Sequence, residues 1–303
     1  VCVASKNEAQ DAADLFDTRT DFPLKRSSIT KLVANWDAKS DNIAGLETAL
    51  NIHHSAMLFL DDNMGELYEV RRALPDIKLL WASPDADANV RALALFPGLE
   101  RSGPILAEDK IRNADTQANE ERRRRQTEMT PEDYLRSLEV KITFDIDQPE
   151  DADRVTALAN KTNQFIFSYK RYTAAQIEAA ITGPDTCVVT ARMSDKLVDS
   201  GIIGVAVVRR NGDTLRVEEV FVSCRALGRG LDDMVVLGLI AVAQSRFGAD
   251  IPLDVVFTDG ARNGPARFFV DAHLSKHLEQ PCYFEYVFPT DLISIVIPKE
   301  KVS

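Results

Sequence analysis

Polar side chains stand where short apolar runs of this sequence end. Ser5 closes the first run, Asp61 and Asp62 follow the run 56–60, and Lys39 stands at the start of a helical stretch. A hydroxyl and an ammonium group can hold a phosphate, and paired carboxylates suit Mg²⁺, which prefers oxygen ligands. Ligands of open α/β sheets bind at the carboxyl ends of the strands. We therefore expect these four side chains to form a catalytic site, with both aspartates as metal ligands, although each residue type is also common on surfaces.

A second candidate is a glycine-containing loop in the other half of the chain, between a predicted strand and a long apolar helix. Its residues are Arg225, Gly228, Arg229 and Gly230. Glycines allow a ligand to approach the backbone closely, and the free N–H groups at the start of a helix attract an anion. We expect this loop to bind a phosphate group; the alternative is a simple turn.

Other candidates flank this loop or precede it. Cys224 stands just before the loop, near a helix N-terminus, a position that favours the thiolate and a covalent thioester role. The alternative is a small buried residue at a strand end. Thr162, Asn163 and Gln164 end a predicted helix. We expect these three to lie beside an acyl group or a pantetheine arm, or else to cap the helix.

The positions of these residues depend on two different patterns of elements. In the first half, apolar runs at 1–5, 56–60 and 77–81 alternate with helices at 7–16, 40–50 and 66–74, which predicts an open parallel α/β sheet. The second half has strands at 139–144, 187–191, 201–208, 215–222 and 253–257, with helices at 150–161, 173–181 and 231–247. Its Asn211-Gly212 turn is typical of a hairpin. The second half is therefore predicted to be α+β.

The segment 109–130 is rich in charge and poor in apolar residues, as a solvated helix is. It suits a connector between domains. We predict a first domain over 1–115, a helical linker over 116–138 that includes the helix start at Thr130-Pro131, and a second domain over 139–303.

Composition excludes several classes of protein. A chain of 303 residues is long enough for two domains, and a net charge of -11 disfavours binding to nucleic acid or anionic lipid. The longest apolar run, 235–243, is far shorter than the roughly 20 residues that span a bilayer. Four cysteines without a C-x-x-C spacing favour a reduced, cytoplasmic setting.

Several segments together resemble a known family. They are 1–7 (VCVASKN), 35–43 (NWDAKSDNI), 59–63 (FLDDN), 132–135 (EDYL), 161–165 (KTNQF), 171–173 (RYT) and 223–230 (SCRALGRG). Over nearly the whole chain the sequence resembles FkbH-like proteins, in which a haloacid dehalogenase-like phosphatase domain of subfamily IIIC is fused to a GNAT-type N-acetyltransferase-like domain. The resemblance implies a partial Rossmannoid parallel sheet followed by an α+β acyltransferase domain.

By this resemblance, Ser5 is the second motif of the phosphatase superfamily, Lys39 the third, and Asp61 and Asp62 the acidic fourth. The first motif, an Asp-x-Asp strand that supplies the nucleophile, is expected ahead of Val1. The run 145–147 (DID) has that pattern, but we interpret it as the turn after a strand.

In the GNAT-type fold, the glycine loop grips the pyrophosphate of coenzyme A. The position often held by a tyrosine general acid is Phe269, which has no hydroxyl. Glu218 and Glu219 lie on the strand where some relatives carry a base, or they are simply solvent-facing carboxylates. This half therefore suits binding of a phosphopantetheine arm better than ordinary N-acetylation.

The function that the resemblance implies is acyl loading. A Mg²⁺-dependent domain takes a phosphorylated three-carbon donor such as 1,3-bisphosphoglycerate, releases phosphate and loads the acyl group onto an acyl carrier protein in polyketide or related secondary-metabolite biosynthesis. The alternatives are a non-catalytic module that binds a carrier protein or coenzyme A, and a GNAT-type N-acetyltransferase.

Overall fold

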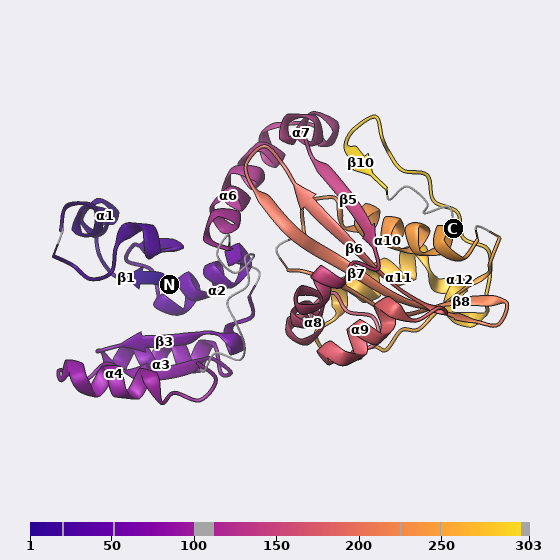
Figure 1. Ribbon diagram of the computed structural model, residues 1–303. Coiled ribbons are helices and arrows are strands. Elements are labelled where there is room, and N and C mark those ends of the chain that lie inside the picture. Colours follow the sequence, from indigo (N-terminus) through magenta and orange to yellow (C-terminus); the bar gives the residue numbers. More distant parts are fainter. Residues whose placement is uncertain (20, 51, 100–111, 225, 249, 298–303) are drawn as a thin grey trace. The chain divides into compact units, whose positions relative to one another are not determined.

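A computed structural model describes residues 1–19, 21–50, 52–99, 112–224, 226–248 and 250–297 (Figure 1). The chain divides into two compact units, Val1–Ile105 and Leu106–Ser303. Across the ranges that the structure describes, every helix is too short or too polar to cross a lipid bilayer.

The first unit alternates strands with helices. In chain order its elements are β1 (Cys2–Ser5), α1 (Ala9–Thr18), η1 (Arg26–Ser28), β2 (Lys31–Ala34), α2 (Lys39–Leu50), η2 (His54–Ala56), β3 (Leu58–Asp61), α3 (Met64–Ala73), β4 (Lys78–Trp81) and α4 (Ala86–Ala94). The sequence predicts β1, β3 and β4. It does not predict β2.

The strands of the first unit form two parallel pairs, one of β1 with β2 and one of β3 with β4, in which Asp61 lies opposite Trp81. The predicted single sheet is therefore present as two ladders, which no backbone pairing joins within the described residues. Each pair is linked through a helix, as parallel strands require. A small core of Ile43, Val70 and Ile77 lies between α2, α3 and the strands.

The second unit is built on a six-stranded mixed sheet. Its elements are α6 (Arg112–Glu128), α7 (Pro131–Leu138), β5 (Lys141–Ile146), η3 (Pro149–Asp151), α8 (Ala152–Lys161), α9 (Ala174–Thr182), β6 (Thr186–Ser194), β7 (Asp199–Asn211), β8 (Thr214–Val222), α10 (Asp232–Phe247), β9 (Leu253–Val255), α11 (Gly264–His273), α12 (Ser275–Glu279) and β10 (Ser294–Val296). The strand order is β10-β5-β6-β7-β8-β9. The strands β5 to β8 are antiparallel neighbours, whereas β9 is parallel to β8 and β10 is parallel to β5. The predicted class, parallel α/β followed by α+β, is confirmed.

Helices cover both faces of this sheet, with α10 on one face and α8 and α9 on the other (Figure 1). Alternate residues of a strand point to opposite faces. In β7, Ala206 and Val208 accordingly belong to the cluster under α10, and Val205 and Val207 to the cluster under α8 and α9. Both faces are buried, so the strands are apolar almost throughout.

Local signals in the sequence fix several boundaries of these elements. The Thr130 side chain caps α7 by accepting from the Asp133 N–H at 3.2 Å. Thr173 and Gln176 form a reciprocal capping box at the start of α9. Gly212 has a φ of +62° in the β7–β8 hairpin, as the Asn-Gly turn predicts.

The charged helix α6 is not simply a solvated face. Arg122 is buried, and its guanidinium contacts Asp195 at 2.7 Å and Asp115 at 3.3 Å. The sequence alone could not reveal this, because the partner Asp195 lies far away in the chain. The run 145–147 is indeed a turn after a strand: Asp147 has a φ of +51° and accepts from the Val188 N–H.

Candidate functional sites

Lys39 and Asp61 form an ion pair in the first unit. The Lys39 Nζ lies 2.5 Å from Asp61 Oδ2, and only 13% and 6% of the two side chains are exposed. Asp61 ends β3 and Lys39 begins α2, so the pair joins a strand end to a helix start. Asp61 Oδ1 accepts from the Asn63 N–H at 2.9 Å, and the Lys39 ammonium lies 5.9 Å from the centre of the Phe59 ring. The structure thus brings together two of the predicted site residues.

Two glutamates of α3 hold the neighbouring residues in place. Glu66 Oε1 accepts from the Lys6 ammonium at 2.7 Å, an interaction that raises the pKa of Lys6. The Glu69 carboxylate accepts from the Ser40 hydroxyl and, at 3.3 Å, from the Ser40 N–H. Lys6 follows Ser5 and Ser40 follows Lys39. Helix α3 therefore contacts both the residue after β1 and the start of α2. This role was not predicted from the sequence, where its signal is the pair of acids Glu66 and Glu69, one helical turn apart, after Asp61 and Asp62.

The other two residues predicted for this site, Ser5 and Asp62, form hydrogen bonds elsewhere through their backbone carbonyls. Ser5 ends β1, is partly buried, and accepts from the Asn35 N–H through its carbonyl at 3.1 Å. Asp62 is exposed, and its carbonyl accepts from the Trp81 indole at 3.0 Å. No hydrogen bond or ion pair joins Ser5 or Asp62 to the Lys39–Asp61 pair among the described residues, so their roles stay predictions.

The donors at this edge suit Mg²⁺ in their chemistry, because they are carboxylate oxygens. Asp61 is engaged by Lys39, whereas the exposed Asp62 carboxylate makes no ion pair among the described residues. Glu66 Oε2 is a buried oxygen that lacks a hydrogen-bond partner in the part of the chain that the structure describes. Magnesium sites in proteins commonly combine one or two carboxylates with water and a substrate phosphate, so Asp61 and Asp62 would be the residues that hold the ion.

The glycine loop of the second unit has the backbone conformation that its sequence predicts. Gly228 and Gly230 have φ values of +77° and +73°, and a Cβ at either residue would meet nothing within 4 Å. The Gly228 N–H already donates to Asp232 Oδ2 at 3.0 Å, at the start of α10. Burial raises the pKa of Asp232 to about 6, from an ordinary value of 3.8. A carboxylate of this chain therefore lies in the loop where an external anion was expected.

The side chain of Arg229 does not face a ligand. It is 5% exposed, and its guanidinium donates to Asp115 at 2.8 Å and to Ser200 at 3.2 Å. This corrects the prediction that Arg229 grips a phosphate: its charge is neutralised inside the unit. Arg225 lies outside the described residues.

Thr162, Asn163 and Gln164 follow α8, and their contacts agree in part with the second of the two predicted roles, which is to cap the helix. The Arg171 guanidinium donates to the Thr162 carbonyl at 2.8 Å and to Asn163 Oδ1 at 2.6 Å. Gln164 Oε1 is buried and has no hydrogen-bond partner among the described residues. Arg171 thus holds the residues that follow the helix, while the buried Gln164 oxygen has no donor among the described residues.

The next residues, 165–167, fill the space beside β8. β9 pairs with β8 only over Leu215–Val217. Farther along β8, the Phe167 N–H donates to the Val220 carbonyl at 3.1 Å, and the Thr258 N–H donates to the Phe167 carbonyl at 2.8 Å. The segment 165–167 is therefore wedged between β8 and the chain that follows β9.

Glu219 holds this segment. It is fully buried on β8, and its carboxylate accepts from the N–H groups of Phe167 at 2.7 Å, Ser168 at 3.0 Å and Lys170 at 2.9 Å. Burial raises its pKa, and these hydrogen bonds oppose that rise. The alternative that Glu219 is a solvent-facing carboxylate is wrong, because the side chain is buried among backbone donors, and its role as a base stays a prediction.

Glu218, next to Glu219, points to the surface and contributes to a pocket. It pairs with Lys170 at 2.6 Å and with Arg209 at 2.7 Å. The cavity beside these residues has a volume of about 390 Å³, and Tyr172 also lines it. The Tyr172 hydroxyl is buried without a hydrogen-bond partner among the described residues, and burial raises its pKa.

Cys224 follows β8 and is partly buried, in contrast to Cys187 on β6, which is fully buried. Burial strongly raises the pKa of Cys187. Phe269 is buried in the core and contacts the rings of Phe165 and Phe167. An aromatic ring without a hydroxyl at this position contributes packing and no proton transfer.

Comparison with protein-family models and with curated proteins gives no match. Among solved structures, the chain is similar to the N-terminal part of a protein from Bacteroides fragilis that contains a phosphatase domain, crystallised with Mg. The identity is 32% over 34% of this chain and 27% of that one, with a TM-score of 0.33. The chain thus spans about a quarter of that structure.

Other similar structures are N-acetyltransferases. A ribosomal-protein-alanine N-acetyltransferase from Brucella melitensis is 14% identical over 49% of this chain and 98% of that one, with a TM-score of 0.33. An IAA acetyltransferase from Bacillus cereus is 14% identical over 49% of this chain and 90% of that one, with a TM-score of 0.31. Identities and scores this low do not assign an activity to this chain.

Proposed function

We propose that this chain is part of a FkbH-like acyl-loading enzyme. Its first unit holds the phosphate end of a phosphorylated three-carbon donor such as 1,3-bisphosphoglycerate, and its second unit receives the phosphopantetheine arm of an acyl carrier protein. The observation that carries the proposal is the Lys39–Asp61 pair, which fixes an ammonium group at the end of a parallel strand.

The chemistry assigned to each group follows from its charge. A phosphate dianion that reaches this edge competes with Asp61 for the Lys39 ammonium, because both are oxygen anions. Mg²⁺, when bound, neutralises phosphate charge as that group leaves. In the overall reaction the bond between the acyl carbon and the phosphate oxygen breaks, a thioester bond to the carrier thiol forms, and the thiol proton leaves on the inorganic phosphate.

Binding of 3-phosphoglycerate measures the first half of this proposal. Titration calorimetry in Mg²⁺ is expected to show binding that Lys39→Met abolishes and Asp62→Asn weakens. Lys196→Met is the matched control, since Lys196 also pairs with a carboxylate, at 2.9 Å, but on an exposed surface of the second unit. Equal binding by wild type and Lys39→Met contradicts the assignment of the site.

Mass spectrometry of the carrier protein measures the second half. The enzyme, in a form that includes an Asp-x-Asp strand, is incubated with the acyl phosphate and either holo or apo carrier protein. We expect the holo carrier to gain the acyl mass and the apo carrier to gain none. Acylation that persists without the phosphopantetheine arm contradicts the proposal.

A second candidate function is a non-catalytic module that binds a carrier protein or coenzyme A. It is favoured by the buried ring of Phe269, which offers no hydroxyl for proton transfer. Glu219, enclosed by backbone N–H groups, is poorly suited to deprotonate an amine, which argues against an N-acetyltransferase. Binding of holo carrier protein with no acyl transfer under any donor would select the module.

A further inference from the structure

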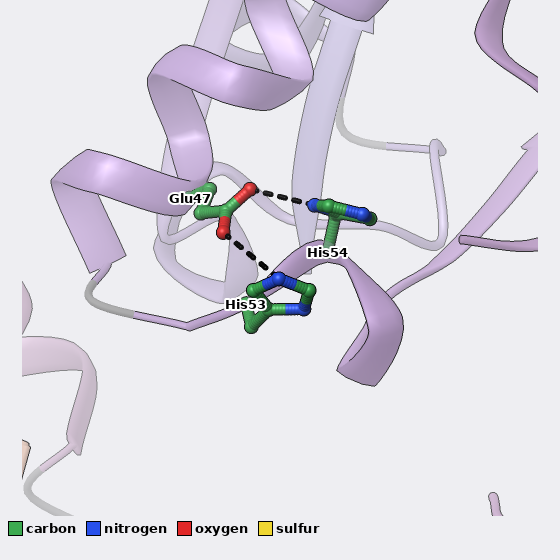
Figure 2. Close-up of side chains that lie close together, drawn as sticks. All are labelled: Glu47, His53 and His54. Atoms are coloured by element: carbon green, nitrogen blue, oxygen red, sulfur yellow. Dashed lines mark hydrogen bonds and ion pairs between the residues drawn. The ribbon is translucent and has the colours of Figure 1, made fainter. Parts of the chain in front are cut away.

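A cluster of two histidines and a glutamate lies away from the sites described above. Glu47 is in the last turn of α2, and His53 and His54 begin the short segment that leads to β3. Figure 2 shows the Glu47 carboxylate beside the two imidazole rings, with one oxygen toward each ring. The Glu47 oxygens lie 2.9 Å from His54 Nδ1 and 3.8 Å from His53 Nε2.

These three side chains come close enough together to share one metal ion. The three ligand atoms lie within 4.8 Å of one another. A tetrahedral Zn²⁺ ion with bonds of about 2.0–2.1 Å has ligand atoms roughly 3.3 Å apart, so small rotations of these side chains would complete the geometry. The two imidazole rings are already stacked, with centroids 4.2 Å apart.

We propose that Glu47, His53 and His54 form a binding site for a divalent transition-metal ion of the Zn²⁺ class. Two imidazoles and one carboxylate are the donors that such ions prefer, whereas Mg²⁺ prefers oxygen alone. Three protein ligands leave a fourth position for water. The Glu47 and His53 side chains are 29% and 47% exposed, so an ion can enter from solvent, while His54 is 15% exposed.

Ser55 supplies the hydrogen bond that a metal-bound histidine needs. When His53 binds metal through Nε2, its proton stays on Nδ1, which lies 2.9 Å from Ser55 Oγ. That hydroxyl can accept the proton's hydrogen bond and so fix the ring. In the structure the same nitrogen accepts from the Ser55 N–H at 3.2 Å. Metal binding through Nε2 would place a proton on Nδ1, so it would exchange this hydrogen bond for the one to the Ser55 hydroxyl.

The position of the cluster gives the ion a structural role. Glu47 is eight residues after Lys39 on α2, or about 12 Å along the helix. The ion therefore lies at the other end of α2 from the Lys39–Asp61 pair. By joining the end of α2 to the segment before β3, it would clamp the strand that carries Asp61 and stabilise the folded first unit.

The test is titration of the whole chain with ZnCl₂ by calorimetry, and with Co²⁺ by visible absorption, in parallel with thermal unfolding. Wild type is expected to bind one ion and to unfold at a higher temperature with it. The double variant His53→Gln/His54→Gln should lose both effects. Ser55→Ala should keep the stoichiometry and lose about tenfold in affinity. MgCl₂ should not compete.

The matched controls lie at the other two of the four histidines of the chain, His273 and His277. His273 pairs with Asp233 at 3.1 Å, and His277 Nδ1 lies 3.0 Å from Cys282 Sγ. His273→Gln and Cys282→Ser should bind Zn²⁺ as wild type does. The proposal is overturned if the double variant binds Zn²⁺ with unchanged affinity, or if Cys282→Ser removes the binding instead. A circular dichroism spectrum equal to that of wild type shows that the double variant is folded.

Discussion

Asp232 accepts a 3.0 Å hydrogen bond from the Gly228 N–H, so an anionic oxygen of the protein already lies in the glycine loop. Its second oxygen, Oδ1, is buried and lacks a hydrogen-bond partner among the described residues. The Gly228 N–H is therefore already bound by a carboxylate of the same chain. An external phosphate would have to bind beside this carboxylate or displace it.

Asp232→Asn is expected to change how stability depends on pH. Burial raises the pKa of Asp232 to about 6, from 3.8. Between these values the folded state binds more protons than the unfolded state, so this group lowers stability as pH rises from about 4 to about 6. Removing the charge should stabilise the protein by about 2 kcal/mol at pH 7 and leave stability at pH 4 nearly unchanged.

Urea unfolding at both pH values measures this difference. The control is Asp233→Asn, because Asp233 is adjacent and its side chain is 63% exposed; a change below about 0.5 kcal/mol is expected. A variant at Asp232 with the same loss of stability between pH 4 and 7 as wild type would contradict the assignment of the titrating group.

Gly228→Ala is expected to weaken binding of coenzyme A and of holo carrier protein. Gly228 has a φ of +77°, and a Cβ at this residue would occupy open space in the loop. We expect the ligand's phosphate to approach the backbone there. Gly212→Ala is the matched control, with a φ of +62° and equally open surroundings in the β7–β8 hairpin.

Both variants should lose about 1–2 kcal/mol of stability, because both place a side chain at positive φ. Only Gly228→Ala should bind more weakly in calorimetry. Equal binding by the two variants would show that the glycine serves the turn alone.

Some of this geometry could be predicted from sequence because it depends on chain direction. Parallel strands bring their carboxyl ends to one edge, so the positions of Asp61 and Lys39 follow once strands and helices are recognised. Capping by Thr130 and the turn at Gly212 were predictable because each depends only on residues close together in the sequence.

Burial of charge could not be predicted, because it depends on residues distant in sequence. In the sequence, Arg229 has the pattern of an anion-binding side chain. In the fold it binds Asp115, which lies 114 residues away. Glu219 looks like an alternating surface residue on a strand, yet the segment after α8 encloses it. The Glu47 cluster was missed because no metal motif has its spacing.

Cys224 is expected to react with iodoacetamide at neutral pH faster than Cys187 does, because Cys187 is fully buried and its raised pKa suppresses the thiolate. Peptide mass spectrometry of the labelled protein compares the two rates. Carrier loading should persist in Cys224→Ala, with a stability loss of about 1 kcal/mol. An acyl adduct present in wild type and absent in Cys224→Ser would instead make Cys224 the nucleophile.

Glu219→Gln is expected to destabilise the second unit and to free the segment 165–168. The Glu219 carboxylate accepts from the N–H groups of Phe167, Ser168 and Lys170. A glutamine has one acceptor oxygen, and its NH₂ group would face donors. Leaving buried N–H groups without acceptors costs about 2–3 kcal/mol.

Glu218→Gln is the matched control, one residue away and with its ion pairs at the surface. Its loss should be below about 1 kcal/mol. Urea unfolding gives both values, and hydrogen exchange of the Phe167 and Ser168 amides should accelerate only in Glu219→Gln. If both amides stay protected, the wedge is held by its β8 pairing rather than by the carboxylate. If they are released, Glu219 is the residue that keeps this segment against β8.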